Sequence, residues 1–348
     1  MKVLIVQVGT PVNPDDYKDQ QLFQEPTITQ GMQYFRYGEV VNNMQTRESI
    51  TEQGILVDHI YFTGRKNPLN CIKAAIKIRQ LVKGKEYELV NQYWGGMSSF
   101  FTAFLCPCVY IISLLGSDLY GQYKQNGSRT LMGRMLSFFS QLTIVFASGV
   151  IVMSGKMKER LWVSSRKKAI AICEGISLAK FFPIPVADAR KHLAWEMEKP
   201  VILFFSSDAY VKNMPLAKKA FEALKEELPS AQLFMVQGIP HAELVWYYNA
   251  ANLLLMTSYH EGSNNSIKEA LACNLPVVSV NVGDAAERLH NVTPSAVVDS
   301  FEPRDLAHEM LKVLRKNMRS NGLDKVNEVE LPNIAVKIVG YYSSFLKN

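Results

Sequence analysis

Residues that bind metals are few in this chain of 348 residues, which has six His and five Cys. No cluster of His, Cys and carboxylate residues has the spacing of a metal site. The odd number of Cys, most of them within apolar runs, favours buried reduced thiols in a cytoplasmic protein over a disulfide framework. Repeats of fixed period and low-complexity tracts are absent too. What remains is an ordinary globular protein without the signature of a structural metal.

Motifs of several other protein classes are also missing. The apolar start Met1–Val8 is not followed by G-x-G-x-x-G, which disfavours a plain dehydrogenase, and no motif supports nucleic-acid binding. The same start enters a strand pattern directly, so we expect no signal peptide. The uncharged stretch Trp94–Ser117 is long enough to cross a bilayer. Because Gly95-Gly96 open it and Pro107 interrupts it, we expect a buried helix and then a buried strand.

The net charge of +6 is spread unevenly along the chain. Residues 1–172 hold 20 Lys and Arg against 12 Asp and Glu, whereas residues 173–348 hold 18 against 20. A basic first half suggests either an anionic partner or membrane surface, or simply a well-solvated surface with no partner.

Strand and helix patterns alternate along the whole chain. In the first half, apolar runs typical of buried strands lie at 3–8, 57–62, 89–93, 108–115, 150–153 and 169–173. Helical patterns lie between them at 33–52, 69–82, 97–105 and 129–146. This alternation predicts an α/β fold with a parallel sheet.

The alternation restarts after a Pro-containing segment near 175–195. Strands are expected at 201–206, 232–237, 253–256, 277–280 and 296–298. Helices are expected at 214–228, 241–250, 264–273, 303–316 and 332–346. We therefore predict a first domain over 1–178, with the helix 332–348 packing back on it, and a second domain over 179–331. Parallel sheets bind ligands beyond the carboxyl ends of their strands.

The segment from Glu261 to Glu269 is the most informative part of the sequence. Two carboxylates eight positions apart enclose the small polar loop Gly262-Ser263-Asn264-Asn265-Ser266, before an apolar helix and a buried strand. Such a loop can hold backbone N–H groups against a phosphate at a helix N-terminus. We expect Glu261 at the end of the preceding strand and Glu269 in the first helical turn. This arrangement suits a ligand with a pyrophosphate in the middle and sugars at both ends, such as a nucleotide-sugar.

Each of these residues also has a purely structural interpretation. Ser266-Ile-Lys-Glu269 has the S-x-x-E pattern of a capping box, in which the Glu closes the helix end. Glu261 alone could be a loop carboxylate and Lys212 an ordinary loop lysine. His241 is expected to be a capping or surface residue.

Taken together, these motifs resemble the retaining glycosyltransferases of family 4 (group 1), whose GT-B fold has two Rossmann-like domains facing a cleft. The family carries E-G-x-x-x-x-x-x-E before an Ala-rich helix, then a Pro-Val-Val strand, a Gly and a further Glu. The corresponding residues of this chain are Glu261-Gly262, Glu269, Ala270, Ala272, Pro276-Val277-Val278, Gly283 and Glu287. Gly116-Ser117-Asp118 is similar to the G-x-D of the first domain, and Lys212 to the family's diphosphate-contacting Lys.

The resemblance implies a role for each of these residues. Glu269 holds the ribose hydroxyls of the nucleotide, and Glu261 contacts the transferred sugar. Ser263, Asn264, Asn265 and Ser266 offer N–H and side-chain donors to the pyrophosphate, and Lys212 neutralises the leaving group. Gly9 and the loop 10–31 lie over the junction of donor and acceptor, with Asp118 nearby. No cofactor and no metal are implied, in keeping with the absence of Asp-x-Asp.

Two departures from the family pattern bear on catalysis. The His that often precedes G-x-D is replaced by Leu115, and the Arg that often accompanies the diphosphate Lys is absent near 206–210. Arg65, Lys66 or Lys156 could supply positive charge instead.

The resemblance implies transfer of a hexose (EC 2.4) from a nucleotide-diphosphate sugar to a glycan or lipid-linked acceptor, in cell-surface polysaccharide synthesis. We expect a cytoplasmic chain that can associate with the inner membrane face, and no nucleic-acid partner. Two alternatives stay open: a non-catalytic protein that binds nucleotide-sugar, and a sugar-nucleotide epimerase of the same architecture.

Overall fold

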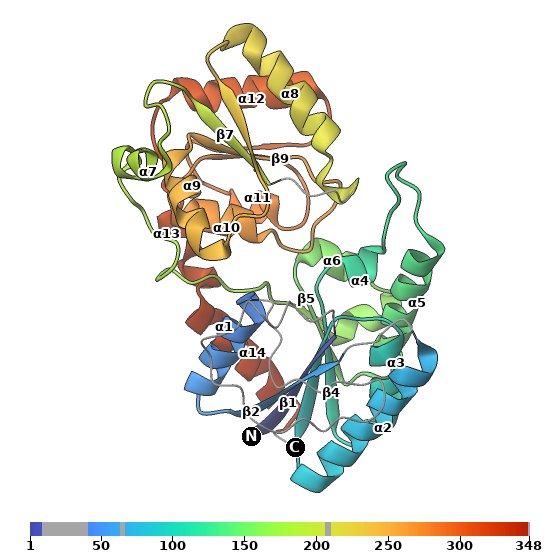
Figure 1. The fold of residues 1–348 in the computed structure, drawn as a ribbon. Helices are drawn as coiled ribbons and strands as arrows, with labels where there is room; N and C mark the ends of the chain where they lie inside the picture. Colours follow the sequence, from blue (N-terminus) through green and yellow to red (C-terminus); the bar gives the residue numbers. More distant parts are fainter. Residues whose placement is uncertain (9–40, 63–66, 206–209, 347–348) are drawn as a thin grey trace. The chain divides into compact units, whose positions relative to one another are not determined.

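The computed structural model describes residues 1–8, 41–62, 67–205 and 210–346. Contacts divide the chain into two compact units (Figure 1). The first comprises Met1–Gln122, Arg129–Gly175 and Leu331–Asn348, and the second comprises Tyr123–Ser128 and Ile176–Glu330. Each unit is built on a parallel sheet, so the predicted α/β fold with two Rossmann-like domains is confirmed.

The first unit contains a parallel sheet with the strand order β2-β1-β3-β4-β5-β6. Its strands are β1 (Lys2–Val8), β2 (Leu56–Phe62), β3 (Leu89–Tyr93), β4 (Val109–Leu114), β5 (Gly149–Val152) and β6 (Ala169–Ala171). All residues of β3 and β5 are buried, as expected for strands that helices cover on both faces.

Helices flank both faces of this sheet (Figure 1). On one face lie α1 (Val41–Glu52) and α14 (Leu331–Ser343), which contact each other. On the other lie α2 (Pro68–Lys85), α3 (Met97–Leu105) and α5 (Leu131–Phe146), packed in that order. The short helices α4 (Ser117–Tyr120), α6 (Gly155–Glu159) and the 3-10 helix η2 (Val163–Lys168) complete the unit.

The uncharged stretch Trp94–Ser117 is divided between α3 and β4, as the sequence predicts. Within the described ranges, no helix combines the length and the apolar character needed to cross a bilayer.

The second unit contains a parallel sheet with the strand order β11-β10-β9-β7-β8. Its strands are β7 (Val201–Phe205), β8 (Gln232–Val236), β9 (Leu253–Met256), β10 (Val277–Val280) and β11 (Ala296–Val298). Helices α8 (Met214–Glu227) and α12 (Pro303–Arg315) pack together on one face. The other face carries α7 (Val186–Leu193), α9 (Leu244–Ala250) and α10 (Asn265–Ala272), while α11 (Ala285–Arg288) and α13 (Leu323–Val326) are single turns.

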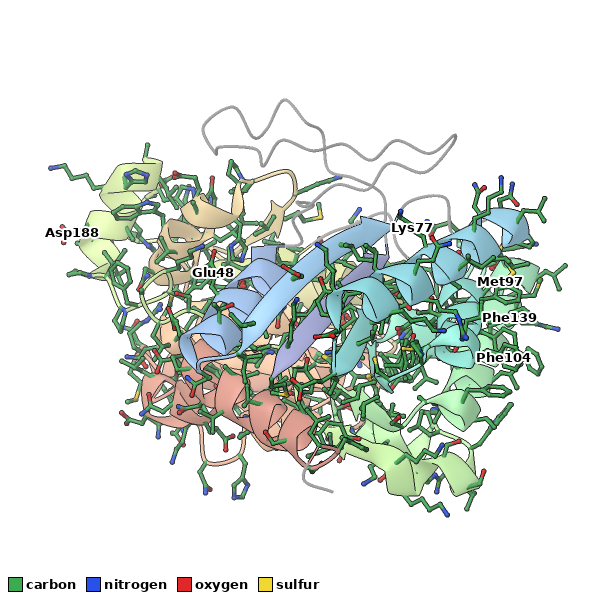
Figure 2. All side chains as sticks on the ribbon, turned by 90° about the horizontal axis from the view of Figure 1, so that it is seen from below. Glu48, Lys77, Met97, Phe104, Phe139 and Asp188 are labelled. Carbon is green, nitrogen blue, oxygen red and sulfur yellow. The ribbon has the colours of Figure 1, made fainter. Side chains whose placement is uncertain are left out.

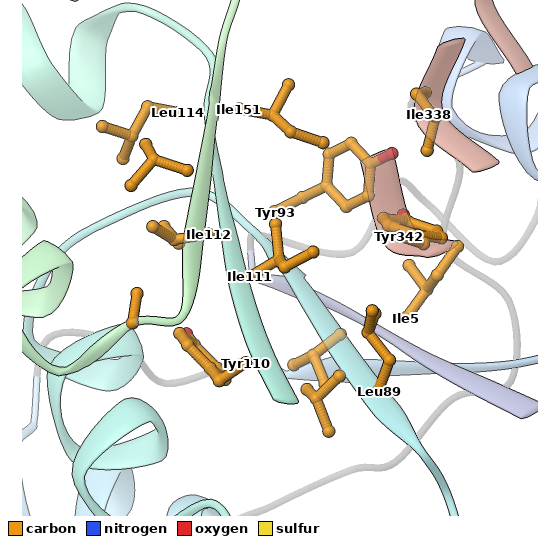
Figure 3. Packing of buried hydrophobic residues seen from close by; sticks show 14 of the residues in the cluster. Ile5, Leu89, Tyr93, Tyr110, Ile111, Ile112, Leu114, Ile151, Ile338 and Tyr342 are labelled. Atoms are coloured by element: carbon orange, nitrogen blue, oxygen red, sulfur yellow. The ribbon is translucent and has the colours of Figure 1, made fainter. Parts of the chain in front are cut away.

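The last helix, α14, is fastened to the sheet of the first unit by buried side chains (Figure 3). Tyr342 is fully buried, and its hydroxyl accepts a 2.6 Å hydrogen bond from Nδ2 of Asn91 in β3. Ile338 is 4% exposed and belongs to the same core as Ile5 and Ile111. The end of the chain therefore contributes to the core formed by its beginning.

Removing the Tyr342 ring tests this attachment. We expect Tyr342→Ala to lower the free energy of unfolding of the first unit by about 3–5 kcal/mol, because the cavity it leaves cannot fully close. Val336→Ala, in the same helix at a side chain that is 55% exposed, should change it by less than about 0.5 kcal/mol. Urea unfolding followed by circular dichroism measures both, and equal effects would show that α14 is not part of the core.

Candidate functional site

Four loops meet at the carboxyl edge of the sheet in the second unit. They follow the strands β7, β8, β9 and β10, which the strand order places side by side. The loops contain, in that order, Tyr210–Lys212, His241–Glu243, residues 257–264 and residues 281–284. Parallel sheets of this kind bind ligands at this edge. Most of the residues singled out from the sequence lie here.

Hydrogen bonds join the loop after β9 to the turn after β7. Thr257 donates from its hydroxyl to the carbonyl oxygen of Lys212 at 2.9 Å, and the backbone N–H of Tyr259 donates to Val211 at 2.8 Å. The rings of Tyr210 and Tyr259 stack with centroids 4.6 Å apart. Asn213 adopts a left-handed conformation with φ of 52°, which turns the chain into α8. Lys212 is thereby held beside the loop that carries Glu261.

Lys212 and Glu261 form an ion pair, with Nζ 2.8 Å from Oε1. The hydroxyl of Ser258 donates to the same carboxylate oxygen at 2.7 Å. The two side chains are 27% and 16% exposed, so both are partly accessible at the rim of the sheet. The resemblance implies that Lys212 contacts the leaving group and Glu261 the transferred sugar. In the structure the two side chains are in direct contact.

The capping-box hypothesis, in which Ser266 caps α10 and Glu269 closes the helix end, is wrong. Asn264 is the N-cap, and its Oδ1 accepts a 3.3 Å hydrogen bond from the N–H of Ile267. The helix therefore begins before Ser266, and Glu269 lies in the second turn instead of the predicted first. A carboxylate so far from the first N–H groups cannot cap them.

Glu269 is instead held by two side chains from other elements. Its Oε2 accepts a 2.7 Å hydrogen bond from the hydroxyl of Tyr248 in α9, and its Oε1 lies 3.0 Å from Nε2 of His241. Glu269 is 4% exposed, and burial beside this carboxylate raises the pKa of Tyr248 well above its usual range. Phe181 packs edge-on against both the His241 and Tyr248 rings.

His241 was expected to cap a helix or lie on the surface, and this expectation is wrong for its side chain. It begins a 3-10 turn, but its ring contacts Glu269 and is 29% exposed. The two residues are 28 positions apart, and local patterns in the sequence carry no information on such a contact. The signal that does predict it is the parallel sheet, because the loop after β8 follows a strand whose carboxyl end lies at the same edge.

Ser263 and Gly262 pack against the loop that follows β10. The hydroxyl of Ser263 donates to Oδ2 of Asp284 at 2.7 Å. A Cβ at Gly283, whose φ is +55°, would lie 3.1 Å from the carbonyl oxygen of Gly262, so a glycine is needed there. Burial raises the pKa of Asp284, and the charge of the fully buried Lys268 opposes this effect.

Two side chains of the predicted phosphate site have partners within the protein. The side chains of Ser263 and Asn264 bind within the protein, the first to Asp284 and the second as the helix cap. They are already used as structural hydrogen-bonding groups. The backbone N–H groups of this loop are the donors that a helix N-terminus offers to a phosphate, and the predicted phosphate contacts of the four side chains stay predictions.

Asp118 belongs to the first unit, where its side chain joins two loops. It is fully buried, and its carboxylate accepts hydrogen bonds from the backbone N–H groups of Gly95, Leu115 and Gly116 at 2.8–3.1 Å. Burial raises its pKa, while these three donors lower it. Asp118 thereby fixes the loops after β3 and β4, and its predicted catalytic role stays a prediction.

Gly9, the loop 10–31, Arg65 and Lys66 lie outside the described residues. Lys156 lies in α6, in the first unit, whose N-cap is Ser154. In the described ranges, no group of three or more His, Cys, Asp or Glu side chains is close enough to hold a metal ion.

The cap on α10 gives a test of the local geometry. Asn264→Ala should lower the free energy of unfolding of the second unit by about 1 kcal/mol, because it removes the acceptor for a helical N–H. Asn264→Ser should retain nearly all of the stability, since Ser is an equally good N-cap. Thermal unfolding compares the two, and equal stabilities would mean that the side chain does not cap the helix.

Comparison with known proteins shows what this arrangement is similar to. Residues 232–316, which include the loop after β9 and all of α10, match the family described as glycosyl transferases group 1. A relative from Campylobacter jejuni, N,N'-diacetylbacillosaminyl-diphospho-undecaprenol alpha-1,3-N-acetylgalactosaminyltransferase, is 24% identical over 269 residues, which cover 68% of this chain and 70% of that protein.

Solved structures show the same fold. Sucrose-phosphate synthase from Thermosynechococcus elongatus aligns with a TM-score of 0.71 at 18% identity, over 99% of both chains. HepE from Anabaena, solved in complex with UDP, aligns with a TM-score of 0.67 at 14% identity, over 99% of this chain and 100% of that one. Both the matched region and the relatives agree with the resemblance found in the sequence: residues 232–316 are similar to the group 1 glycosyltransferases, and the chain has a GT-B type of fold.

Proposed function

We propose that this enzyme is a retaining hexosyltransferase of family 4, which uses a nucleotide-diphosphate sugar and works without a metal. The observation that carries the proposal is the ion pair of Lys212 and Glu261 at the rim of the sheet, one loop away from the N-terminus of α10. A cation, a helix N-terminus, the partly exposed carboxylate of Glu261 and the buried one of Glu269 together suit a ligand that has both phosphates and hydroxyl groups. The Anabaena neighbour is described with bound UDP and, in another structure, with UDP-glucose.

The proposed donor fits the spacing along α10. The first N–H groups of the helix bind the diphosphate, with Lys212 neutralising its charge. Glu269 lies five residues beyond Asn264, which at 1.5 Å per residue is about 7.5 Å along the helix. Its carboxylate, oriented by Tyr248 and His241, accepts hydrogen bonds from the ribose hydroxyls. Glu261, released from Lys212, contacts the transferred sugar.

The proposed reaction exchanges one bond at the anomeric carbon for another on the same face of the sugar. The bond from this carbon to the diphosphate oxygen breaks, and a bond to the acceptor hydroxyl oxygen forms. The acceptor proton passes to the departing diphosphate, so no protein nucleophile is required. Lys212 stabilises the charge that develops on the leaving group.

We propose a glycan or lipid-linked acceptor, in the synthesis of cell-surface polysaccharide. The relative from Campylobacter jejuni is named for an acceptor in which the sugar is linked to undecaprenol through a diphosphate. Its name, together with the basic first half of this chain, supports an acceptor at a membrane surface.

Thermal unfolding with a panel of UDP-, GDP-, ADP- and dTDP-sugars tests donor binding. A ligand at about 100 times its dissociation constant adds roughly 2.7 kcal/mol, which raises Tm by several degrees. One nucleotide should give this shift to the wild type and to Glu226→Gln, which changes an exposed residue of α8. Glu269→Gln should lose most of it, and EDTA should not alter it. The proposal is wrong if no nucleotide shifts Tm, or if Glu269→Gln responds like the wild type.

Nuclear magnetic resonance of the sugar released by slow hydrolysis of the donor separates the remaining alternatives. A retaining transferase first yields the anomer that was present in the donor. An epimerase changes the sugar while it is still attached to the nucleotide, and a non-catalytic protein leaves the donor intact. Either of these two outcomes would contradict transfer.

A further inference from the structure

One face of helix α5 exposes apolar side chains where an amphipathic helix would carry polar ones. Leu131, Met135, Phe138 and Val145 are 75%, 43%, 54% and 49% exposed. They follow one another at intervals of four, three and seven residues, so they form one stripe along the helix. The opposite side of α5 packs against the sheet through buried residues such as Ile144. The helix is therefore apolar on both its inner and its outer side.

Neighbouring elements extend this stripe into a larger surface. Phe104 at the end of α3 is 61% exposed and packs edge-on against Phe146, with ring centroids 5.4 Å apart. Trp162 lies edge-on to Phe138 at 6.3 Å, and the adjacent Val163 is 78% exposed. Figure 2 shows Met97, Phe104 and Phe139 gathered at one edge of the first unit.

We call these side chains the apolar face and define it by its exposed members. They are Phe104, Leu131, Met132, Met135, Phe138, Val145, Phe146, Trp162 and Val163. These nine are almost half of the 19 large hydrophobic side chains that are exposed in the described residues. Monomeric proteins rarely expose so many together unless the patch contacts something.

The charge around the apolar face is mainly positive. From Leu119 to Cys173 the sequence contains nine Lys and Arg residues and a single acidic residue, Glu159. Arg134 lies within the apolar stripe, and Lys167 follows Val163 in η2. Both are exposed.

Two other basic residues hold this part of the surface together. Nζ of Lys168 donates to the carbonyl oxygens of Ile144, Val145 and Ala147 at the C-terminus of α5. The guanidinium of Arg166 donates to the carbonyl oxygens of Glu159 and Leu161. The segment that carries Trp162, Val163 and Lys167 is thereby fixed beside α5.

We propose that the apolar face docks on an anionic lipid bilayer. Aromatic and aliphatic side chains enter the interface between headgroups and acyl chains, while Arg134 and Lys167 contact the lipid phosphates. At 16 residues α5 is about 24 Å long, so it lies in the plane of the membrane and does not span it. The inference rests on the proposed function, because a lipid-linked acceptor would be presented at this surface.

Co-sedimentation of the full chain with vesicles tests the proposal. Binding to phosphatidylcholine vesicles that contain phosphatidylglycerol should exceed binding to pure phosphatidylcholine, and should fall as salt is added. Leu131→Ser/Phe138→Ser should weaken binding at least about tenfold. Arg134→Gln/Lys167→Gln should weaken it about fivefold for each charge, and only on anionic vesicles. The fluorescence of wild-type Trp162 should shift to the blue on binding, and Trp162→Phe should lose this shift.

Matched variants control for general effects of the substitutions. Val336→Ser and Met318→Ser change apolar side chains that are 55% and 56% exposed on other elements, and should bind vesicles like the wild type. The proposal is overturned if the chain does not bind anionic vesicles, or if these controls lose as much binding as the α5 variant. It is also overturned if Leu131→Ser/Phe138→Ser abolishes a dimer in light scattering and leaves vesicle binding unchanged.

The donor experiment keeps the two proposals distinguishable. All of these variants should keep the Tm shift produced by the nucleotide-sugar, since the changed residues are not part of the donor site. A variant that loses vesicle binding but keeps the Tm shift therefore tests membrane docking by the apolar face and leaves the proposed donor site unaffected.

Discussion

The contact of Lys212 with Glu261 depends on how two loops of the second unit are joined. Neither side chain is fixed by a helix or strand of its own, since Lys212 ends a 3-10 turn and Glu261 lies in a loop. Thr257 and Tyr259 bond the second loop to the backbone of the first, and Ser258 fixes the carboxylate. An ion pair at a partly exposed rim contributes little to stability. In the proposed donor site, the pair keeps a cation and an anion in place where a charged ligand can exchange with either of them.

The buried carboxylates of Asp118 and Asp284 order loops through hydrogen bonds. Asp118 accepts three backbone N–H groups in the first unit, and Asp284 accepts the hydroxyl of Ser263 in the second. In both cases a short acidic side chain joins loops at the carboxyl ends of strands. Exposed loops bury few apolar side chains, so packing alone orders them poorly. Hydrogen bonds to a buried carboxylate order them instead.

The strands and most helices could be predicted because they depend on local patterns. The expected strand 277–280 and helix 97–105 coincide with β10 and α3, where apolar runs end at Gly, Pro or polar residues. The details of the candidate site depend on contacts between distant segments, which such patterns do not contain. The capping box at Ser266 was wrong because both Asn264 and Ser266 are good caps, and the helix uses the first. The contact of His241 with Glu269 and the burial of Asp118 were missed for the same reason.

The most direct test of the account is whether Lys212 recognises a diphosphate. Isothermal titration should compare the dissociation constants of the nucleoside diphosphate and monophosphate, with the base chosen from the thermal panel, for the wild type and Lys212→Met. The wild type should prefer the diphosphate, and Lys212→Met should reduce this preference about 10- to 100-fold, the effect of one or more charge-assisted hydrogen bonds. If Lys212→Met keeps the preference of the wild type, Lys212 is only the structural partner of Glu261, and the proposed donor site is wrong.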